Sequence, residues 1–74
     1  MKIRRYRFPR PAFVADNINS LKQIRSTCSI SLLDVGSATL IPITLLQDWE
    51  AGTGYPSQTN YNKLAAFFDW EAWL

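Results

Sequence analysis

The side chains that usually carry catalysis or bind metal ions are sparse in this 74-residue chain. It has no histidine, the commonest general base, and its single cysteine, Cys28, forms neither a thiol–imidazole pair nor a set of metal ligands. The six acids are scattered, and the neighbouring Asp48 and Glu50 face different sides of a helix. The segment from Gly52 to Gly54 lacks the lysine that a nucleotide-binding loop contains. We therefore expect no enzyme, no cofactor and no metal site.

The cations, in contrast, are concentrated in one segment. Five of the eight lie in the first ten residues, and three cations against six acids give the remainder a net charge of −3. These five cations are Lys2, Arg4, Arg5, Arg7 and Arg10. Because Pro9 and Pro11 disfavour a helix here, we expect an extended basic arm that contacts phosphates or enters a minor groove. A solvated tail, or a short strand that packs Ile3, Tyr6 and Phe8, is the alternative.

The spacing of residues 30–56 predicts two short helices that cross at close range. Gly36 supplies the small residue that such a crossing needs, and Pro42 has a fixed φ that suits a first helical turn. The inner face of the second helix would consist of Leu46, Trp49 and Glu50. Gly52 would then end this helix in the left-handed conformation. Such a helix-turn-helix is typical of DNA binding.

Upstream of this unit we expect an arm and connector in residues 1–15, followed by a helical domain in residues 16–74. Asp16 or Asn17 can cap the first helix, whose pattern is lost near Thr27.

Further capping signals predict the other helices. Ser31 and Asp34 have the spacing of a capping box for the second helix. Ser57 or Thr59 can cap a fourth helix, which we expect to end at Asp69.

The carboxyl end is rich in aromatic residues. We expect a further helical turn in residues 70–74, and we expect Trp70 or Trp73 to reach a homodimer interface, because paired half-sites on DNA require paired domains.

Size and hydropathy indicate one small domain. The apolar stretch between Asp34 and Asp48 is too short for a membrane span, which needs about 20 residues. The basic amino end is not followed by an apolar signal core, and the lone Cys28 fits a reducing compartment. We therefore expect a cytoplasmic protein without membrane contact.

Six short motifs, taken in order, resemble the Cro and phage-repressor (Xre-type) helix-turn-helix family. They are LKQIR at residues 21–25, IS at 30–31, Gly36, EAG at 50–52, Pro56 and KLA at 63–65. The resemblance covers about residues 20–70. It implies an all-α, lambda repressor-like bundle of four to five helices that binds double-stranded DNA and regulates transcription in a phage, plasmid or mobile element.

The resemblance also implies roles for individual residues. Arg25 and Glu50 would form a structural ion pair. The residues at the family's base-contact positions are Ile43, Thr44, Gln47 and Asp48. These offer thymine-methyl contact from Ile43 and Thr44, an adenine contact from Gln47 and acceptance from cytosine by Asp48, but no bidentate reading of guanine by arginine.

Phosphate contacts are expected next to the helix that begins near Pro42. Leu32 replaces the family's phosphate-binding glutamine, which leaves Ser31 and backbone amides at a helix amino terminus. Thr53 and Tyr55 can add contacts from the loop that follows.

Two other interpretations stay open. Ile43 and Leu45 can belong to an apolar outer face that docks on a protein partner, which would make the chain a protein-binding adaptor. A winged-helix protein of the excisionase or MerR kind would instead place a hairpin in residues 52–62. Salt dependence separates adaptor from DNA binding, because only phosphate contacts release counterions.

Overall fold

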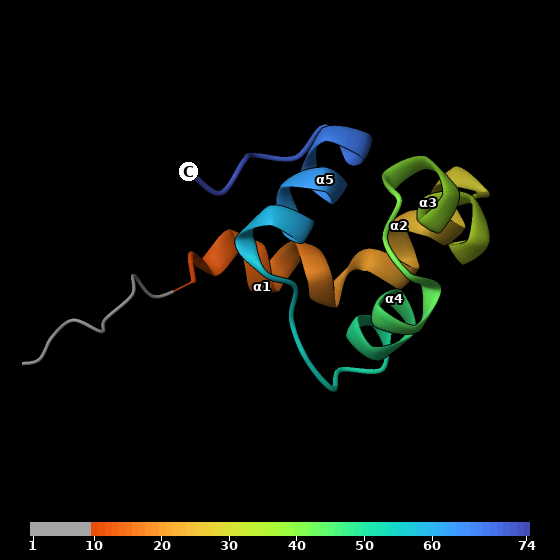
Figure 1. The fold of residues 1–74 in the computed structure, drawn as a ribbon, viewed down its shortest axis with the longest axis horizontal. Coiled ribbons are helices and arrows are strands. Elements are labelled where there is room, and N and C mark those ends of the chain that lie inside the picture. Colours follow the sequence, from red (N-terminus) through yellow and green to blue (C-terminus); the bar gives the residue numbers. More distant parts are fainter. Residues whose placement is uncertain (1–9) are drawn as a thin grey trace, which may run out of the picture.

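Five helices form the regular structure of residues 10–74, the part of the chain that the computed structural model describes (Figure 1). They are α1 (Ala12–Asn19), α2 (Leu21–Cys28), α3 (Leu32–Thr39), α4 (Ile43–Glu50) and α5 (Gln58–Phe68). The described residues contain no strand, so the expected all-α class is confirmed. The hairpin that a winged helix needs in residues 52–62 is absent there, because α5 occupies residues 58–62. The expected arm cations Lys2, Arg4, Arg5 and Arg7 lie outside the described residues.

The start of the helical body differs from the prediction. We expected a connector through residue 15 and a cap at Asp16 or Asn17, but α1 already begins at Ala12, so that expectation is wrong. Pro11 occupies the position before the first helical residue, where its missing amide leaves no hydrogen bond unmade.

Burial explains why α1 forms without a capping side chain. Val14, Ile18 and Leu21 recur at helical spacing, and all three are fully buried. Ser20 interrupts the helix with φ −95° and ψ 0°, after which α2 continues from Leu21. Hydrophobic burial of the apolar face therefore stabilises α1 where local capping does not.

Tyr61 of α5 is the largest fully buried side chain of the core. Its hydroxyl accepts a hydrogen bond from Asn17 Nδ2 at 3.0 Å and donates one to the Glu71 carbonyl at 2.9 Å. A buried hydroxyl without such partners would destabilise the fold, so both bonds are needed. Through Tyr61, α1, α5 and the carboxyl-terminal segment meet in one core.

Residues 70–74 form no further helical turn, and this expectation is wrong. The Asn62 amide instead accepts from the Trp73 amide at 2.7 Å and donates to the Trp73 carbonyl at 2.8 Å. Gln58 Nε2 donates to the same carbonyl at 2.8 Å. These side chains satisfy the backbone of an irregular segment, which therefore lies against α5 rather than coiling.

Local signals set the other helix ends as predicted. Ser31 Oγ accepts from the Asp34 amide at 3.0 Å while Asp34 Oδ2 accepts from the Ser31 amide at 3.2 Å, which completes the capping box of α3. Ser57 caps α5, and Asp69 ends it with a left-handed φ of 61°. Gly52 follows α4 with φ 80°.

The contact between α3 and the start of α4 is close at Gly36. A methyl group at this position would lie 3.2 Å from the Ile41 carbonyl oxygen and 3.6 Å from Leu46 Cδ1. Because one neighbour is backbone, the site can yield only by a small shift. Gly36 is therefore the small residue that lets α3 and α4 pack together.

We expect Gly36→Val to lower the free energy of unfolding by about 1–3 kcal/mol, because a branched side chain overpacks the crossing. Ser37→Val is the control, since Ser37 lies on the exposed face of the same helix, where valine meets no close neighbour. Valine is a better helix former than glycine and is similar to serine, so a loss at residue 36 cannot come from helix propensity. Urea unfolding of both variants measures the difference. Equal destabilisation by the two substitutions would contradict the role assigned to Gly36.

Candidate nucleic-acid interface

Helix α4 has one buried face and one free face. Leu46 and Trp49 are buried in the core. The four residues expected to contact bases, Ile43, Thr44, Gln47 and Asp48, are all exposed. The expected contact residues thus share one solvent-facing surface, defined here as the outer face of α4.

The orientation of α4 is fixed at its carboxyl end by an ion pair. The structure brings together Arg25 of α2 and Glu50: Arg25 Nε lies 2.5 Å from Glu50 Oε2, and Arg25 Nη2 lies 2.9 Å from Oε1. Arg25 Nη1 donates to the Ile30 carbonyl at 2.9 Å. The hydrogen bonds to Glu50 raise the pKa of Arg25 above its ordinary value, against the opposing effect of desolvation. The pair therefore ties α2, the α2–α3 connection and α4 together.

A six-residue hydrogen-bond motif ends α4. The Thr53 amide donates to the Asp48 carbonyl at 3.0 Å, and the Gly52 amide donates to the Trp49 carbonyl at 3.2 Å. This is the Schellman pattern, which requires the positive φ that Gly52 adopts. It sets the direction in which the α4–α5 loop, residues 51–57, leaves the carboxyl end of α4.

The two loop residues expected to contact phosphate use their hydroxyl protons within the protein. Thr53 Oγ1 donates to the Asp48 carbonyl at 2.9 Å, and the Tyr55 hydroxyl donates to Asn19 Oδ1 at 3.2 Å. A phosphate oxygen needs a donor, so neither hydroxyl can serve it without breaking these bonds. The Tyr55 ring instead contacts a cation, because Arg10 Cζ lies 4.0 Å from the centroid of the ring.

Ser31 lies exposed at the amino terminus of α3, where we expected a phosphate contact from the family resemblance. The Asp34 carboxylate already binds the Ser31 amide there. An anion thus occupies the end of the helix that a phosphate would use. This arrangement weakens the amino terminus of α3 as a phosphate site.

The segment of residues 26–62, which includes α3 and α4, contains neither lysine nor arginine, whereas it holds Asp34, Asp48 and Glu50. Arg25 neutralises Glu50, which leaves Asp34 and Asp48 exposed. Attraction to a nucleic acid must therefore come from outside this region.

Four apolar side chains of α3, α4 and the connection between them are exposed. Leu33 of α3 is 65% exposed, and Leu40, in the connection to α4, is 81% exposed. Ile43 and Leu45 are each 36% exposed. Sequence reasoning singled out Ile43 and Leu45 but missed Leu33 and Leu40, because helical spacing alone does not show which apolar residues a neighbouring helix leaves uncovered.

Trp70 and Trp73, the residues expected at a dimer interface, pack within the chain. The Trp70 ring stacks on Tyr61 with centroids 5.9 Å apart, and Trp73 contacts the same ring edge-on at 6.3 Å. Both tryptophans are half-buried by these contacts. The surface that they leave for a second copy is correspondingly small.

Two further features are absent from residues 10–74. No group of three His, Cys, Asp or Glu side chains in this range is arranged to hold a metal ion. No helix there is long and apolar enough to cross a membrane. Cys28 is a free, exposed thiol at the end of α2.

No protein-family model, curated protein or solved structure matches this chain.

We expect Glu50→Gln to lower the free energy of unfolding by about 3 kcal/mol, because it leaves the Arg25 guanidinium without its counter-ion. This lies at the lower end of the usual range for a buried pair, since the two side chains retain 16% and 10% exposure. Thermal unfolding followed by circular dichroism measures the loss. The double variant Arg25→Met/Glu50→Leu should be closer to the natural chain than Glu50→Gln is. An unchanged melting temperature for Glu50→Gln would show that the pair does not hold α4.

Proposed function

We propose that this chain is a small DNA-binding transcriptional regulator whose α3 and α4 form a helix-turn-helix. In this proposal α4 enters the major groove of double-stranded DNA. The observation that carries it is the free outer face of α4, which holds Ile43, Thr44, Gln47 and Asp48 on a helix fixed by packing and by the Arg25–Glu50 pair. A helix that is firmly held yet open along one side is what reading of base edges requires.

The composition of the outer face determines which bases it would read. Ile43 and Thr44 present methyl groups that suit thymine, and the Gln47 amide can pair with adenine. Asp48 can accept a hydrogen bond from the cytosine amino group. Since arginine and lysine are absent from α4, the outer face supports sequence preference but contributes no attraction to phosphates.

The basic amino-terminal segment would supply that attraction. Five cations in the first ten residues can neutralise up to five phosphates, which compensates for the acids of the remainder. A second copy of the chain on an adjacent half-site would double these contacts and add base contacts one DNA turn away. Homodimerisation is thus part of the proposal.

A titration of the full chain with duplex DNA from the region flanking its own gene tests the proposal. The logarithm of the binding constant should fall by about 0.9 per logarithmic unit of salt for each neutralised phosphate. Replacing Lys2, Arg4, Arg5 and Arg7 together by alanine should remove most of this slope. Lys22→Ala, which removes an exposed cation from α2, is the control and should leave the slope nearly unchanged. Binding that is absent, or insensitive to salt, would refute the proposal.

Base reading has its own test. We expect Gln47→Ala to weaken binding to the preferred site by about 5- to 150-fold, the equivalent of roughly 1–3 kcal/mol for one bidentate base contact. Binding to unrelated DNA should not change. Gln23→Ala makes the same substitution at an exposed position of α2 and serves as the control. Fluorescence anisotropy with both duplexes distinguishes the outcomes, and equal weakening on the two DNAs would exclude base reading by Gln47.

A protein-binding adaptor is the second candidate, favoured by the state of Leu40. This residue adopts a left-handed φ of 62° and is 81% exposed. Glycine would avoid the backbone strain, and the exposed side chain contributes little to the core. An apolar side chain retained under these conditions, with Leu33 also exposed, suits a protein contact.

The two candidates respond oppositely to substitution of these leucines. The variant Leu33→Ser/Leu40→Asn should keep its fold, because both side chains are exposed and asparagine tolerates the left-handed conformation. Under the DNA proposal its affinity for DNA stays close to that of the natural chain. Under the adaptor alternative the natural chain shows no salt-dependent DNA binding, and the substitutions abolish binding to the protein partner.

A further inference from the structure

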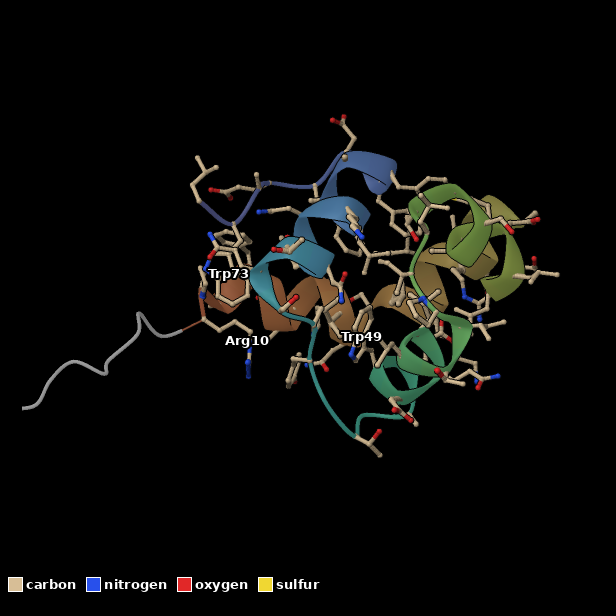
Figure 2. The ribbon with its side chains drawn as sticks, in the orientation of Figure 1. Arg10, Trp49 and Trp73 are labelled. Atoms are coloured by element: carbon tan, nitrogen blue, oxygen red, sulfur yellow. The ribbon has the colours of Figure 1, made fainter. Side chains whose placement is uncertain are left out.

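Three residues from separate parts of the chain form a connected group beside the α4–α5 loop. Arg10, where the basic segment joins α1, lies over the ring of Tyr55 with Cζ 4.0 Å from the ring centroid. The Tyr55 hydroxyl donates to Asn19 Oδ1, at the end of α1, at 3.2 Å. Figure 2 shows Arg10 at the amino-terminal start of the described residues, just before α1. The loop thus holds the last cation of the basic segment.

We infer that Tyr55 is a positioning residue that holds Arg10 for contact with a DNA phosphate. This inference rests on the proposed function. A guanidinium stacked on an aromatic ring uses its face, so its N–H groups, which lie in the plane, stay available for two phosphate oxygens. Arg10 contacts the phosphate directly, whereas Tyr55 acts through Arg10.

The electrostatic surroundings of Arg10 support this role. Arg10 forms no ion pair with an acid of residues 10–74, where the ion pair is Arg25–Glu50. Residues 1–9 contain no acid. No side-chain carboxylate therefore competes for the Arg10 guanidinium. Arg10 is also exposed. An exposed guanidinium without a carboxylate partner is ready to bind an anion.

The position of the loop supports it as well. Tyr55 follows Gly52 by three residues, and Gly52 ends the helix proposed to enter the groove. Residues 26–62 supply no cation of their own, so a phosphate beside this loop would meet Arg10 as its positive partner. Tyr55 thereby connects the basic segment to the loop that follows α4.

The alternative role for Tyr55 is direct contact with phosphate through its hydroxyl. That proton is donated to Asn19, so the hydroxyl has no second proton to offer. The ring and the hydroxyl can be separated experimentally. Tyr55→Phe keeps the ring that holds Arg10, and Tyr55→Leu removes it.

A double-mutant cycle on the full chain tests the inference, with duplex DNA from the region flanking its gene as the probe. We expect Arg10→Ala to reduce the salt slope by about 0.9, the value for one phosphate. Tyr55→Leu should weaken binding by about 2- to 5-fold, the range for an exposed cation–π contact. Arg10→Ala/Tyr55→Leu should bind no more weakly than Arg10→Ala alone, because both substitutions disable one unit. Tyr55→Phe should bind like the natural chain.

Each contrary outcome has a distinct meaning. If Tyr55→Phe weakens binding as much as Tyr55→Leu, or if the effects of Arg10→Ala and Tyr55→Leu simply add, Tyr55 does not act through Arg10 and the inference is wrong. If the natural chain binds DNA but Arg10→Ala leaves the salt slope unchanged, the inference fails while the proposed function stands. If the natural chain shows no salt-dependent binding, both fail. Thermal unfolding of each variant checks that the fold is retained.

Discussion

The arrangement of the helices depends on the Arg25–Glu50 ion pair. Three guanidinium nitrogens of Arg25 donate, two of them to Glu50 and one to the Ile30 carbonyl. A bidentate pair restrains rotation as well as distance, so it holds α4 at one angle about its own axis. Leu46 and Trp49 anchor the same helix in the core. Together these contacts determine which side of α4 faces solvent, and every functional interpretation of the chain depends on that side.

The same ion pair also removes a cation from the surface near α4. With Arg25 paired to Glu50, the remaining charged side chains of residues 26–62 are Asp34 and Asp48. The capping box that stabilises α3 places one of these acids at a helix amino terminus, which stabilises the helix but occupies an anion site. Helix stability and phosphate binding therefore conflict in this region. The conflict is resolved if the cations come from the basic segment, with Arg10 as its described end.

Predictions from the sequence succeeded where the cause of a structure is local. Ser31 with Asp34, Ser57, Gly52 and Asp69 each set a helix end through bonds or dihedral angles within a few residues, and these ends were predicted. The start of α1 and the carboxyl-terminal segment were missed because their causes are tertiary: burial of Val14 and Ile18, and the bonds from Asn62 to Trp73. At the site, the exposed residues of α4 followed from helical periodicity. The stacking of Arg10 on Tyr55 joins positions 45 residues apart, which no local pattern reveals.

Gly36 and Leu40, near the connection between α3 and α4, are subject to different physical constraints. At residue 36 a side chain would meet the Ile41 carbonyl oxygen, and a backbone atom can move away only if the connection itself shifts. At residue 40 the left-handed φ of 62° costs about 1–2 kcal/mol for a residue with a Cβ, a cost that a folded domain can tolerate. Glycine therefore stands where the constraint is steric, and leucine stands where the constraint is only conformational. Since Leu40 adds strain and is mostly exposed, core stability does not explain its side chain.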